Sequence, residues 1–582
     1  MITPPIYAGI FEGHFDPSVA FVCDGKVIAY AEEERFIRHK HAPFTYPIRS
    51  LKYCLDRTGI RPGDIAAVGI NWNLPAYSDG RMKSFFAKTG EVFPPDENTR
   101  KWQRHVLGYF DYENTRRRHE LNWRRALGTV APPLHPIPHH FVHALHSYCQ
   151  SPFTDALCIT IDGSGDQHCT VLWHCQGDSI RSVKEICIPH SLGWFYAAFT
   201  EYLGFKAYDG EYKVMGLAAY GHPDNELNSK ISKILFTADD EIEYRIDPKY
   251  LHYGVHTWSD RFTDSLVELF EHPVRLPHEP VTKWHQNLAY AVQQQFQEAV
   301  CRLVIWGMNE FGERNLCVGG GCGLNVKMNS KLFSLDCVDD LFAHPLCSDG
   351  GAATGAALGA CWQLSGKCPE PLKSLALGPE ETDEDIRSVL DSCLIKYTKV
   401  DNIAEATADE LAAGRTVGWF QGRMEAGPRA LGQRSILADP RKVEMRDQIN
   451  KAVKFRESWR PFCPSMPAED AEKYLLSYTD APFMNIAFDA SEVLARDAPG
   501  IVHTDGTVRV QLVHYDVLPL FHSLLRAFER RTGIAVLLNT SFNIKGEPIV
   551  CTLSDALRTF FSSGLDVLVA GHFIVRKNRE VS

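Results

Sequence analysis

No part of this 582-residue chain has the pattern of a membrane anchor or of a secretion signal. Its uninterrupted apolar runs stay well below the roughly 18 residues that cross a bilayer as a helix. The first residues, MITPPIYAGI, lack the basic region and the long apolar region of a signal peptide. We therefore expect a cytoplasmic protein that has no membrane partner.

The 17 cysteines never form a C-x-x-C pair, so the sequence contains no zinc finger of the usual spacing. In a long chain without a signal peptide, scattered cysteines favour reduced thiols over a disulfide framework. This distribution agrees with a cytoplasmic location.

Basic residues are fewer than acidic residues in this chain. Lysine and arginine number 61 against 72 aspartates and glutamates, which gives a net charge of −11. An acidic protein binds nucleic acid and anionic membranes poorly, although it can still contain a basic pocket. We therefore expect no nucleic-acid partner.

The chain is too long for one hydrophobic core, and one pattern occurs twice in it. Residues 6–34 and 155–190 each contain three β-rich runs joined by short turns, followed by mainly helical sequence. This repeat predicts a duplicated α/β domain of the actin/sugar-kinase/Hsp70 (ASKHA) type, which binds nucleotide between its halves. The first turns, at 13–16 and 162–166, would then face the phosphates. Since glycine and aspartate favour turns anyway, plain hairpin turns are the alternative.

A charged, aromatic-rich insertion at about 75–130 separates the two repeats. It is predicted to be helical and exposed. Its basic cluster, ENTRRRHE, is interpreted as a solvated face and not as a nucleic-acid site.

His139 and His143 are four residues apart in the segment HHFVHALHSYCQ. On a helix both imidazoles would leave the same face, one turn apart, as two ligands of one metal do. About one H-x-x-x-H pair is expected by chance from 24 histidines in 582 residues, and three occur, the others being His135/His139 and His252/His256. The spacing therefore proves nothing by itself. A metal site would also need carboxylates nearby in space.

A glycine run and an aspartate follow a predicted helix at 288–310. The run at 319–321 comes directly after a short apolar strand, where glycine allows a ligand to approach the backbone closely. Asp349 stands just before the small-residue helix AATGAALGA, where its carboxylate would cap that helix or bind metal. Capping is the commoner role for an isolated Asp-Gly-Gly.

Residues 366–382 combine proline, glycine and charge without periodicity and are interpreted as a linker to a second domain. This domain should open with a helix near 402–413 and the strand TVGWFQ. Its loop at 422–435 holds three arginines among glycines and a proline, which suits bidentate recognition of phosphate or carboxylate. Surface salt bridging is the alternative, since acidic residues abound.

Taken together, these motifs resemble the NodU/CmcH family of O-carbamoyltransferases nearly from end to end. The N-terminal part matches through GHFDPS, EEERFIRHKH, HHFVHA, DGSGD, SLGWFY, EYKVMGLAAYG, GGGCGLN and SDGG. The C-terminal part matches through GRMEAGPRALGQRSILADPR, KFRESWRPF and LLNTSFNIKGEPIV. The chain departs from the family at GHFDPS, where an HDSA-type string is commoner, but His14 is kept.

The resemblance implies a TsaD-like ASKHA domain at 1–365 that transfers the carbamoyl group, and a YrdC-like α/β domain at 383–582 that forms carbamoyl adenylate. Carbamoyl phosphate and ATP with Mg(II) would supply the adenylate. A hydroxyl of a small natural product, as in antibiotic biosynthesis, would accept the carbamoyl group. The acceptor itself is not predicted, and a homodimer is one expected assembly.

The resemblance also implies roles for particular residues. The first domain would hold Fe(II) or another divalent metal on His139, His143, Asp162 and Asp349. His14 would be catalytic beside the acceptor. The nucleotide pocket of that domain would contain Glu211, Lys213, Gly319, Gly320, Gly321 and Asn325. In the second domain, carbamoyl phosphate would bind Arg429, Arg460, Arg509 and Asn539. ATP would bind Arg434, Lys454, Ser541 and Asn543.

Three other functions are alternatives to carbamoyl transfer to a small molecule. Threonylcarbamoylation of tRNA uses the same two domain types but needs a basic surface. Hydrogenase maturation by a HypF-like protein adds zinc fingers, which are absent here. Loss of His14 or of the H-x-x-x-H pair would favour a non-catalytic nucleotide-binding regulator, and both are present.

Overall fold

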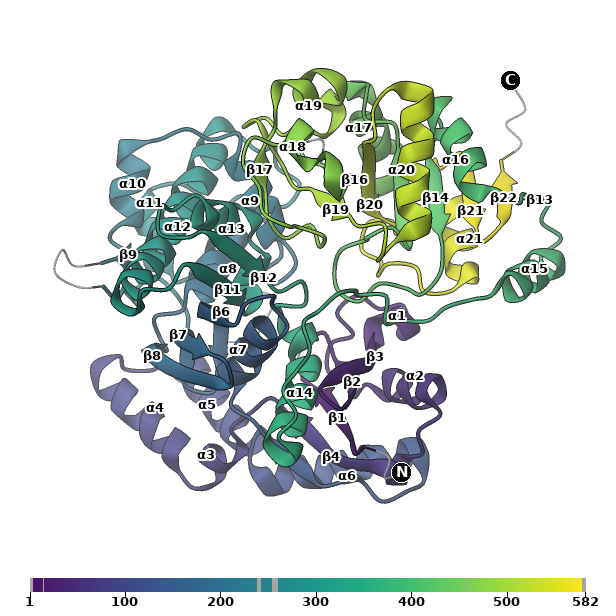
Figure 1. Ribbon diagram of the computed structural model, residues 1–582. Helices are drawn as coiled ribbons and strands as arrows, with labels where there is room; N and C mark the ends of the chain where they lie inside the picture. The colour runs from purple at the N-terminus through teal and green to yellow at the C-terminus, as the bar shows by residue number, and fades with distance from the viewer. Residues whose placement is uncertain (1–3, 14, 238–241, 254–259, 458, 578–582) are drawn as a thin grey trace. The chain divides into compact units, whose positions relative to one another are not determined.

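The computed structural model describes residues 4–13, 15–237, 242–253, 260–457 and 459–577 (Figure 1). The chain divides into two compact units. Unit 1 comprises Met1–Ala29 and Phe44–Leu372, and unit 2 comprises Tyr30–Pro43 and Lys373–Ser582. The sequence did not set apart the N-terminal segment Tyr30–Pro43, which belongs to unit 2. No helix in the described ranges has both the length and the hydropathy needed to cross a bilayer.

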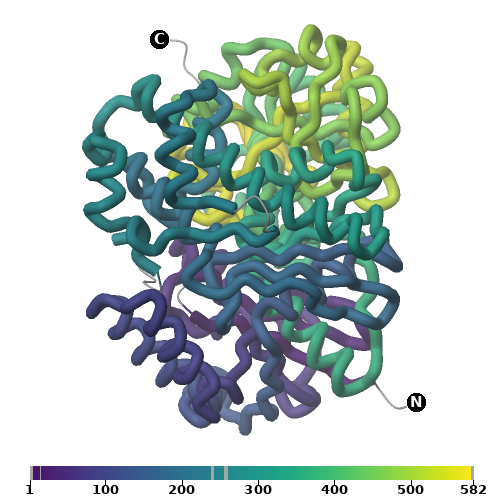
Figure 2. Tube along the Cα trace, turned by 90° about the vertical axis from the view of Figure 1, so that its left-hand side faces the viewer, coloured from purple at the N-terminus to yellow at the C-terminus, as the bar shows by residue number. Residues whose placement is uncertain are grey.

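Unit 1 contains two five-stranded sheets of the same plan, each a three-stranded meander followed by two parallel strands. In the first sheet the order is β3-β2-β1-β4-β5, formed by β1 (Ile6–Phe11), β2 (Ser18–Cys23), β3 (Lys26–Glu32), β4 (Ile65–Ile70) and β5 (Leu134–Pro136). In the second the order is β8-β7-β6-β11-β12, formed by β6 (Asp155–Gly165), β7 (His168–Gln176), β8 (Ser179–Cys187), β11 (Asn315–Gly319) and β12 (Asp340–Ala343). Figure 2 shows the β6–β8 meander, in blue, as extended traces side by side. The predicted duplicated α/β architecture is confirmed.

Helix α14 (Ala352–Ser365) lies unusually close to the first sheet and to helix α7 (His139–Cys149). A Cβ added to Gly9 would stand 1.8 Å from the carbonyl oxygen of Ala353, and one added to Gly69 would stand 2.1 Å from that of Ala356. A Cβ on Gly355 of the helix would stand 2.6 Å from the Val142 carbonyl oxygen. Glycines at these contacts therefore allow the close packing, which places the start of α14 beside α7.

The insertion between the repeats is helical, as predicted. It forms α3 (Leu74–Ser78), α4 (Arg81–Val92), α5 (Glu97–Tyr109) and α6 (Tyr112–Leu127). Arg116 of its basic cluster pairs with Glu113 at 2.7 Å and Glu120 at 2.6 Å on the exposed face of α6. Thr115, His119 and Trp123 of the same helix are buried, so the insertion is exposed only in part.

Unit 2 is an α/β unit built on one mixed eight-stranded sheet. Its order is β13-β22-β21-β14-β15-β20-β16-β19, formed by β13 (Thr398–Lys399), β14 (Val417–Phe420), β15 (Arg434–Ala438), β16 (Cys463–Pro467), β19 (Gln511–Val513), β20 (Leu537–Ser541), β21 (Val567–Ala570) and β22 (Phe573–Arg576). The predicted opening helix is α16 (Ile403–Ala412), which packs against α20 (Pro519–Thr532). The predicted strand TVGWFQ is β14.

The segment interpreted as a linker is hydrogen-bonded into unit 2 from about residue 375. Ala376 forms a β-bridge with Glu425, and the Ala426 N–H donates to the Leu375 carbonyl at 2.8 Å. Arg423 donates through Nη2 to the Leu377 carbonyl at 2.6 Å. This part of the segment therefore supports the arginine-rich loop and is not a free tether.

Candidate functional site

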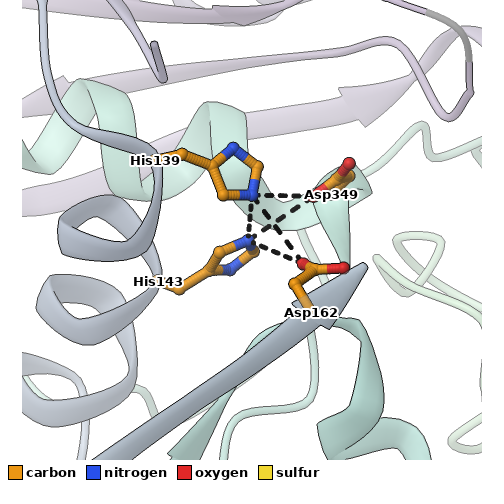
Figure 3. Close-up of side chains that lie close together, drawn as sticks. All are labelled: His139, His143, Asp162 and Asp349. Atoms are coloured by element: carbon orange, nitrogen blue, oxygen red, sulfur yellow. Dashed lines mark hydrogen bonds and ion pairs between the residues drawn. The ribbon is translucent and has the colours of Figure 1, made fainter. Parts of the chain in front are cut away.

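The segment HHFVHALHSYC is helical (α7), so its two imidazoles lie one turn apart on one face. His139 and His143 are both completely buried, and their Nε2 atoms are 3.1 Å apart (Figure 3). Both rings therefore direct the same nitrogen toward one point.

Two carboxylates from distant segments face that point. Asp162 comes from β6, and Asp349 opens the 3₁₀ turn η3 (Asp349–Gly351) before α14. Asp162 Oδ2 is 3.8 Å from His139 Nε2 and 3.3 Å from His143 Nε2. Asp349 Oδ1 is 3.4 Å from each Nε2. The four donor atoms all lie within 4.8 Å of one another.

The cluster is closed on the histidine side and open on the carboxylate side. The histidine side chains have no exposed surface, whereas 17% of Asp162 and 35% of Asp349 remain exposed. A bound metal would therefore be reached from the side of the two carboxylates.

The geometry fits a divalent cation. Metal–ligand bonds of about 2.1 Å place tetrahedral ligands about 3.4 Å apart and neighbouring octahedral ligands about 3.0 Å apart. The Nε2–Nε2 and Nε2–Oδ separations of 3.1–3.8 Å fall around these values. Asp349 Oδ1 is buried and has no hydrogen-bond partner among the described residues, which leaves it available as a ligand. Two imidazoles with two carboxylates suit Fe(II), Mn(II) or Zn(II).

The electrostatics of the cluster favour positive charge at its centre. Burial lowers the pKa of His139, but Asp349 and Asp162 outweigh burial and raise that pKa to about 10. Burial alone would raise the pKa of Asp162, but hydrogen bonds with His139 and His143 hold it well below its usual value. The carboxylates therefore carry negative charge that either protonated imidazoles or a cation can balance.

Asn71 orients the first of these histidines. It follows β4, is 1% exposed, and its amide Nδ2 is 3.2 Å from His139 Nδ1. The Oδ1 of Asn71 is buried without a partner among the described residues. Because amide nitrogen and oxygen are interchangeable by a flip, Oδ1 can instead accept the Nδ1–H of His139. His139 would then present a bare Nε2 to the cluster. Sequence reasoning missed Asn71, although a polar residue directly after a buried strand was the available signal.

The turn after β6 fixes the start of α7. Asp166 accepts the His139 N–H through Oδ2 and the Asn73 N–H through Oδ1, both at 3.0 Å. The ring of Trp72 packs on His139 at a centroid distance of 4.8 Å. The orientation of His139 is thus determined from three sides.

The glycine run at 319–321 lies against β6, the strand that carries Asp162. The Gly321 N–H donates to Asp162 Oδ2 at 3.1 Å. A Cβ on Gly320 would stand 2.3 Å from the Ile161 carbonyl oxygen, and one on Gly319 would stand 2.4 Å from Ser147 Oγ. Close packing on the chain itself therefore already accounts for glycine at 319 and 320, and contact with a nucleotide stays a prediction.

The other residues predicted for the nucleotide pocket make specific contacts. Glu211 accepts the N–H groups of Tyr208 at 2.8 Å and Gly210 at 3.1 Å, and burial raises its pKa. Lys213 Nζ stands 5.5 Å from the centroid of the Phe205 ring. Asn325 caps α13 (Val326–Phe333) and exchanges hydrogen bonds with Gln293. His14, the predicted catalytic residue, lies outside the described residues.

In unit 2, three of the residues predicted to bind ATP meet directly. Lys454 is 5% exposed and ends the π-helical turn η4 (Asn450–Lys454), a distortion common at functional sites. Its Nζ donates to the Ser541 carbonyl at 2.6 Å and to the Asn543 Oδ1 at 2.7 Å. Burial, with the charges of Arg456, Arg460 and Lys40, holds the pKa of Lys454 well below its usual value. The neighbouring cations that lower this pKa would attract a bound anion, and the anion would in turn favour the charged form of Lys454.

Arg434, the fourth predicted ATP residue, has a structural role in this geometry. It is completely buried and donates to the carbonyl oxygens of Gln421 at 2.8 Å, Gly422 at 3.1 Å and Pro379 at 3.2 Å. Its guanidinium also lies over the Phe420 ring at 3.7 Å. Arg434 thereby fixes the arginine-rich loop from within, and a direct contact with ATP stays a prediction.

Two of the residues predicted to bind carbamoyl phosphate are connected through β16: Asn539 on the neighbouring strand β20, and Arg509 between β18 (Thr507–Val508) and β19. Asn539 is completely buried on β20, where its Nδ2 donates to Ser465 Oγ at 3.0 Å and Gln511 Oε1 at 3.2 Å. Its Oδ1 is buried without a partner in the described part of the chain. Cys463, opposite Asn539 in the sheet, accepts from Arg509 Nε at 2.8 Å. Ser465 and Gln511 were not predicted.

The remaining two arginines lie in loops, Arg429 before β15 and Arg460 before β16. Arg429 follows the turn at Gly427, and Arg460 Nη1 stands 4.0 Å from Glu457 Oε2. The 20% exposed side chain of Arg460 contributes to the positive field at Lys454. Their contact with carbamoyl phosphate stays a prediction.

Comparisons with known proteins cover both units. A family model described as "Carbamoyltransferase N-terminus" matches residues 7–358, and one described as "Carbamoyltransferase C-terminus" matches residues 408–577. Nodulation protein NolNO of Sinorhizobium fredii is 33% identical over 575 residues, which cover 97% of this chain and 79% of that protein. Nodulation protein NolO of Bradyrhizobium diazoefficiens is 37% identical over 448 residues, 75% of this chain and 78% of that protein. Among solved structures, component A of the Acidaminococcus fermentans (R)-2-hydroxyglutaryl-CoA dehydratase covers 61% of this chain and 97% of its own at 15% identity, with a TM-score of only 0.30.

Proposed function

This chain is a member of the carbamoyltransferase family, and from that premise we propose that it is an ATP-dependent O-carbamoyltransferase acting on a small hydroxyl-bearing compound. Residues 383–582 would form carbamoyl adenylate from carbamoyl phosphate and ATP, and residues 1–365 would transfer the carbamoyl group. The observation that carries the proposal is the convergence of two buried imidazoles and two carboxylates in unit 1.

The first reaction would use the Lys454 region of unit 2. Formation of one carbamoyl adenylate from carbamoyl phosphate, ATP and water releases one phosphate and one pyrophosphate. Both substrates are anions, and Lys454, Arg429, Arg460 and Arg509 supply cationic donors for them. The unpartnered Oδ1 of Asn539 is an acceptor suited to the amide N–H of the carbamoyl group.

The second reaction would occur in unit 1. The acceptor oxygen bonds to the carbamoyl carbon, the bond from that carbon to the phosphate oxygen of AMP breaks, and AMP leaves. His14 is proposed to take the hydroxyl proton as a general base. A divalent cation held by His139, His143, Asp162 and Asp349 would supply positive charge against the phosphate of the leaving AMP.

Incubation of the purified protein with carbamoyl phosphate, ATP, Mg(II) and a divalent transition metal tests this function. Acceptor hydroxyl compounds are screened by the mass gain of one carbamoyl group. AMP release that depends on a small hydroxyl compound supports the proposal. AMP release stimulated only by tRNA would replace it with tRNA modification.

Asn71 provides a test of the metal site that does not depend on transfer. Asn71→Ala is expected to weaken binding of Mn(II) or Fe(II) by about 10- to 100-fold, because His139 loses the acceptor that keeps the proton on Nδ1. Asn71→Asp keeps an acceptor and should retain most of the affinity. Metal titration of the two variants and the parent protein measures both effects. Equal affinities in the parent and in Asn71→Ala would show that Asn71 only packs.

A further inference from the structure

A short helix from the N-terminal part of the chain is built into unit 2. The helix α1 (Glu33–Ile37) lies within Tyr30–Pro43, the segment that belongs to this unit. Phe36 packs against a buried cluster formed by Met424, Ile549 and Cys551. Arg38 donates to the carbonyl oxygens of Ile549 at 2.7 Å and Pro548 at 2.9 Å. The segment is therefore held by apolar contact and by hydrogen bonds.

Arg35 extends from this helix to the arginine-rich loop. Its side chain is 4% exposed, and its Nη2 donates to the Gly427 carbonyl at 2.6 Å. Its Nε donates to Glu32 Oε2 at 2.7 Å, and Glu34 Oε1 stands 3.5 Å away. Burial alone would lower the pKa of Arg35, but Glu32 and Glu34 raise it, so the guanidinium stays charged. The bond to Gly427 is thus a buried, charge-assisted hydrogen bond.

The carbonyl that Arg35 holds belongs to the turn that leads to Arg429. Gly427 has φ +87°, a left-handed conformation that favours glycine, and Pro428 follows it. On either side the loop is fixed by other groups. Glu425 Oε1 accepts the Leu431 N–H at 2.7 Å, and the Ala426 N–H donates to the Leu375 carbonyl at 2.8 Å. Arg35 contacts this turn from the N-terminal segment.

We propose that Arg35 is a positioning residue for the anion-binding loop of unit 2, acting through the Gly427 carbonyl to place Arg429 against carbamoyl phosphate. This inference rests on the proposed function of the loop. Without the bond, the peptide plane between Gly427 and Pro428 loses its fixed orientation, and Arg429 moves with it. Displacements near 1 Å at a substrate-positioning residue can cost about 100-fold in rate.

The test uses full-length variants and carbamoyl-phosphate-dependent release of pyrophosphate. Arg35→Gln is expected to raise the KM for carbamoyl phosphate by about tenfold or more, with the KM for ATP unchanged, because Lys454 is held by other contacts. Arg35→Lys keeps the charge and one donor, so it should restore part of the affinity. Arg38→Gln is the matched control, since Arg38 lies on the same segment but binds the carbonyls of Pro548 and Ile549. It should leave the KM for carbamoyl phosphate unchanged.

Several outcomes would overturn the inference. One is an unchanged KM in Arg35→Gln while Arg429→Ala loses the reaction. Another is an equal rise in both KM values, or the same effect in Arg38→Gln, which would show that Arg35 only stabilises the fold. If Arg35→Gln does not fold, Arg35→Lys takes its place, and an equal rise in its KM values for carbamoyl phosphate and for ATP overturns the inference as well. If Arg429→Ala itself has no effect on pyrophosphate release, the proposed function of the loop is wrong. The Arg429 variant therefore tests the function of the loop, and the Arg35 variants test the positioning role of Arg35.

Discussion

Replacing His143 with alanine is expected to abolish stoichiometric binding of a divalent cation and to lower carbamoyl transfer by more than about 100-fold. Loss of a residue that only supports a metal ligand typically costs 10- to 100-fold, so loss of a ligand should cost at least as much. The Nε2 atom of His143 is 3.3 Å from Asp162 Oδ2 and 3.4 Å from Asp349 Oδ1. Removal of this imidazole therefore leaves two carboxylates beside one imidazole. Metal analysis of the purified variant and assay of the transfer step measure the two effects.

The matched control is His135→Ala. His135 shares the H-x-x-x-H spacing with His139, but its Nε2 pairs with Gln363 Oε1 at 2.7 Å and it is not part of the cluster. Its substitution should leave metal content unchanged. Carbamoyl-phosphate-dependent pyrophosphate release, assigned to unit 2, should continue in both variants. Equal metal content in His143→Ala and the parent protein would refute the metal assignment.

Replacing Arg429 with alanine is expected to lower carbamoyl-phosphate-dependent pyrophosphate release by about 10²- to 10³-fold, as loss of one donor to a reacting anion does in other enzymes. The phosphate loses a charge-assisted contact that the aliphatic replacement cannot supply. Metal content of unit 1 should not change, because all four proposed ligands lie in that unit. Initial rates of pyrophosphate release over a range of carbamoyl phosphate concentrations measure the loss.

Arg387→Ala serves as the control for loss of an arginine in the same unit. Arg387 forms an ion pair with Glu384 at 3.0 Å, and 55% of the Arg387 side chain and 82% of the Glu384 side chain are exposed. Pairs of this kind contribute little to stability, so this variant should retain the parental rate. Parental rates in Arg429→Ala as well would show that the loop arginines serve only as surface pairs.

The local patterns of the sequence were sufficient for the main elements of the fold. The two meanders were predicted because alternating apolar runs and turn residues act over a few neighbouring positions, and each five-stranded sheet contains one of them. The same holds for α7, where a spacing of four residues places His139 and His143 on one face. The small-residue run after Asp349 was likewise predicted to be a helix. The structure shows that this helix packs directly on the backbone at Gly9 and Gly69.

Side-chain roles that depend on distant segments could not be predicted from local patterns. Arg434 lies in a glycine-rich loop of the kind that binds phosphate. Its guanidinium, however, donates to the carbonyl oxygens of Gln421, Gly422 and Pro379. Asn325 was predicted beside a glycine run, and its amide caps α13 and pairs with Gln293. In both cases the partners are groups whose position only the folded chain defines.

The sequence by itself determined which residues are able to bind metal and anions, and the tertiary structure decided which of them meet. Asp349 could cap a helix or bind a metal, because the sequence Ser-Asp-Gly-Gly is the same in either role. The close packing of α14 on the first sheet and on α7 brings its carboxylate to 3.4 Å from both imidazoles. Arg35 reaches Gly427 across 392 positions of sequence. The periodicity of a sequence predicts only local structure, because it relates residues that are close along the chain. Contacts between distant positions form when the apolar faces of different elements pack together.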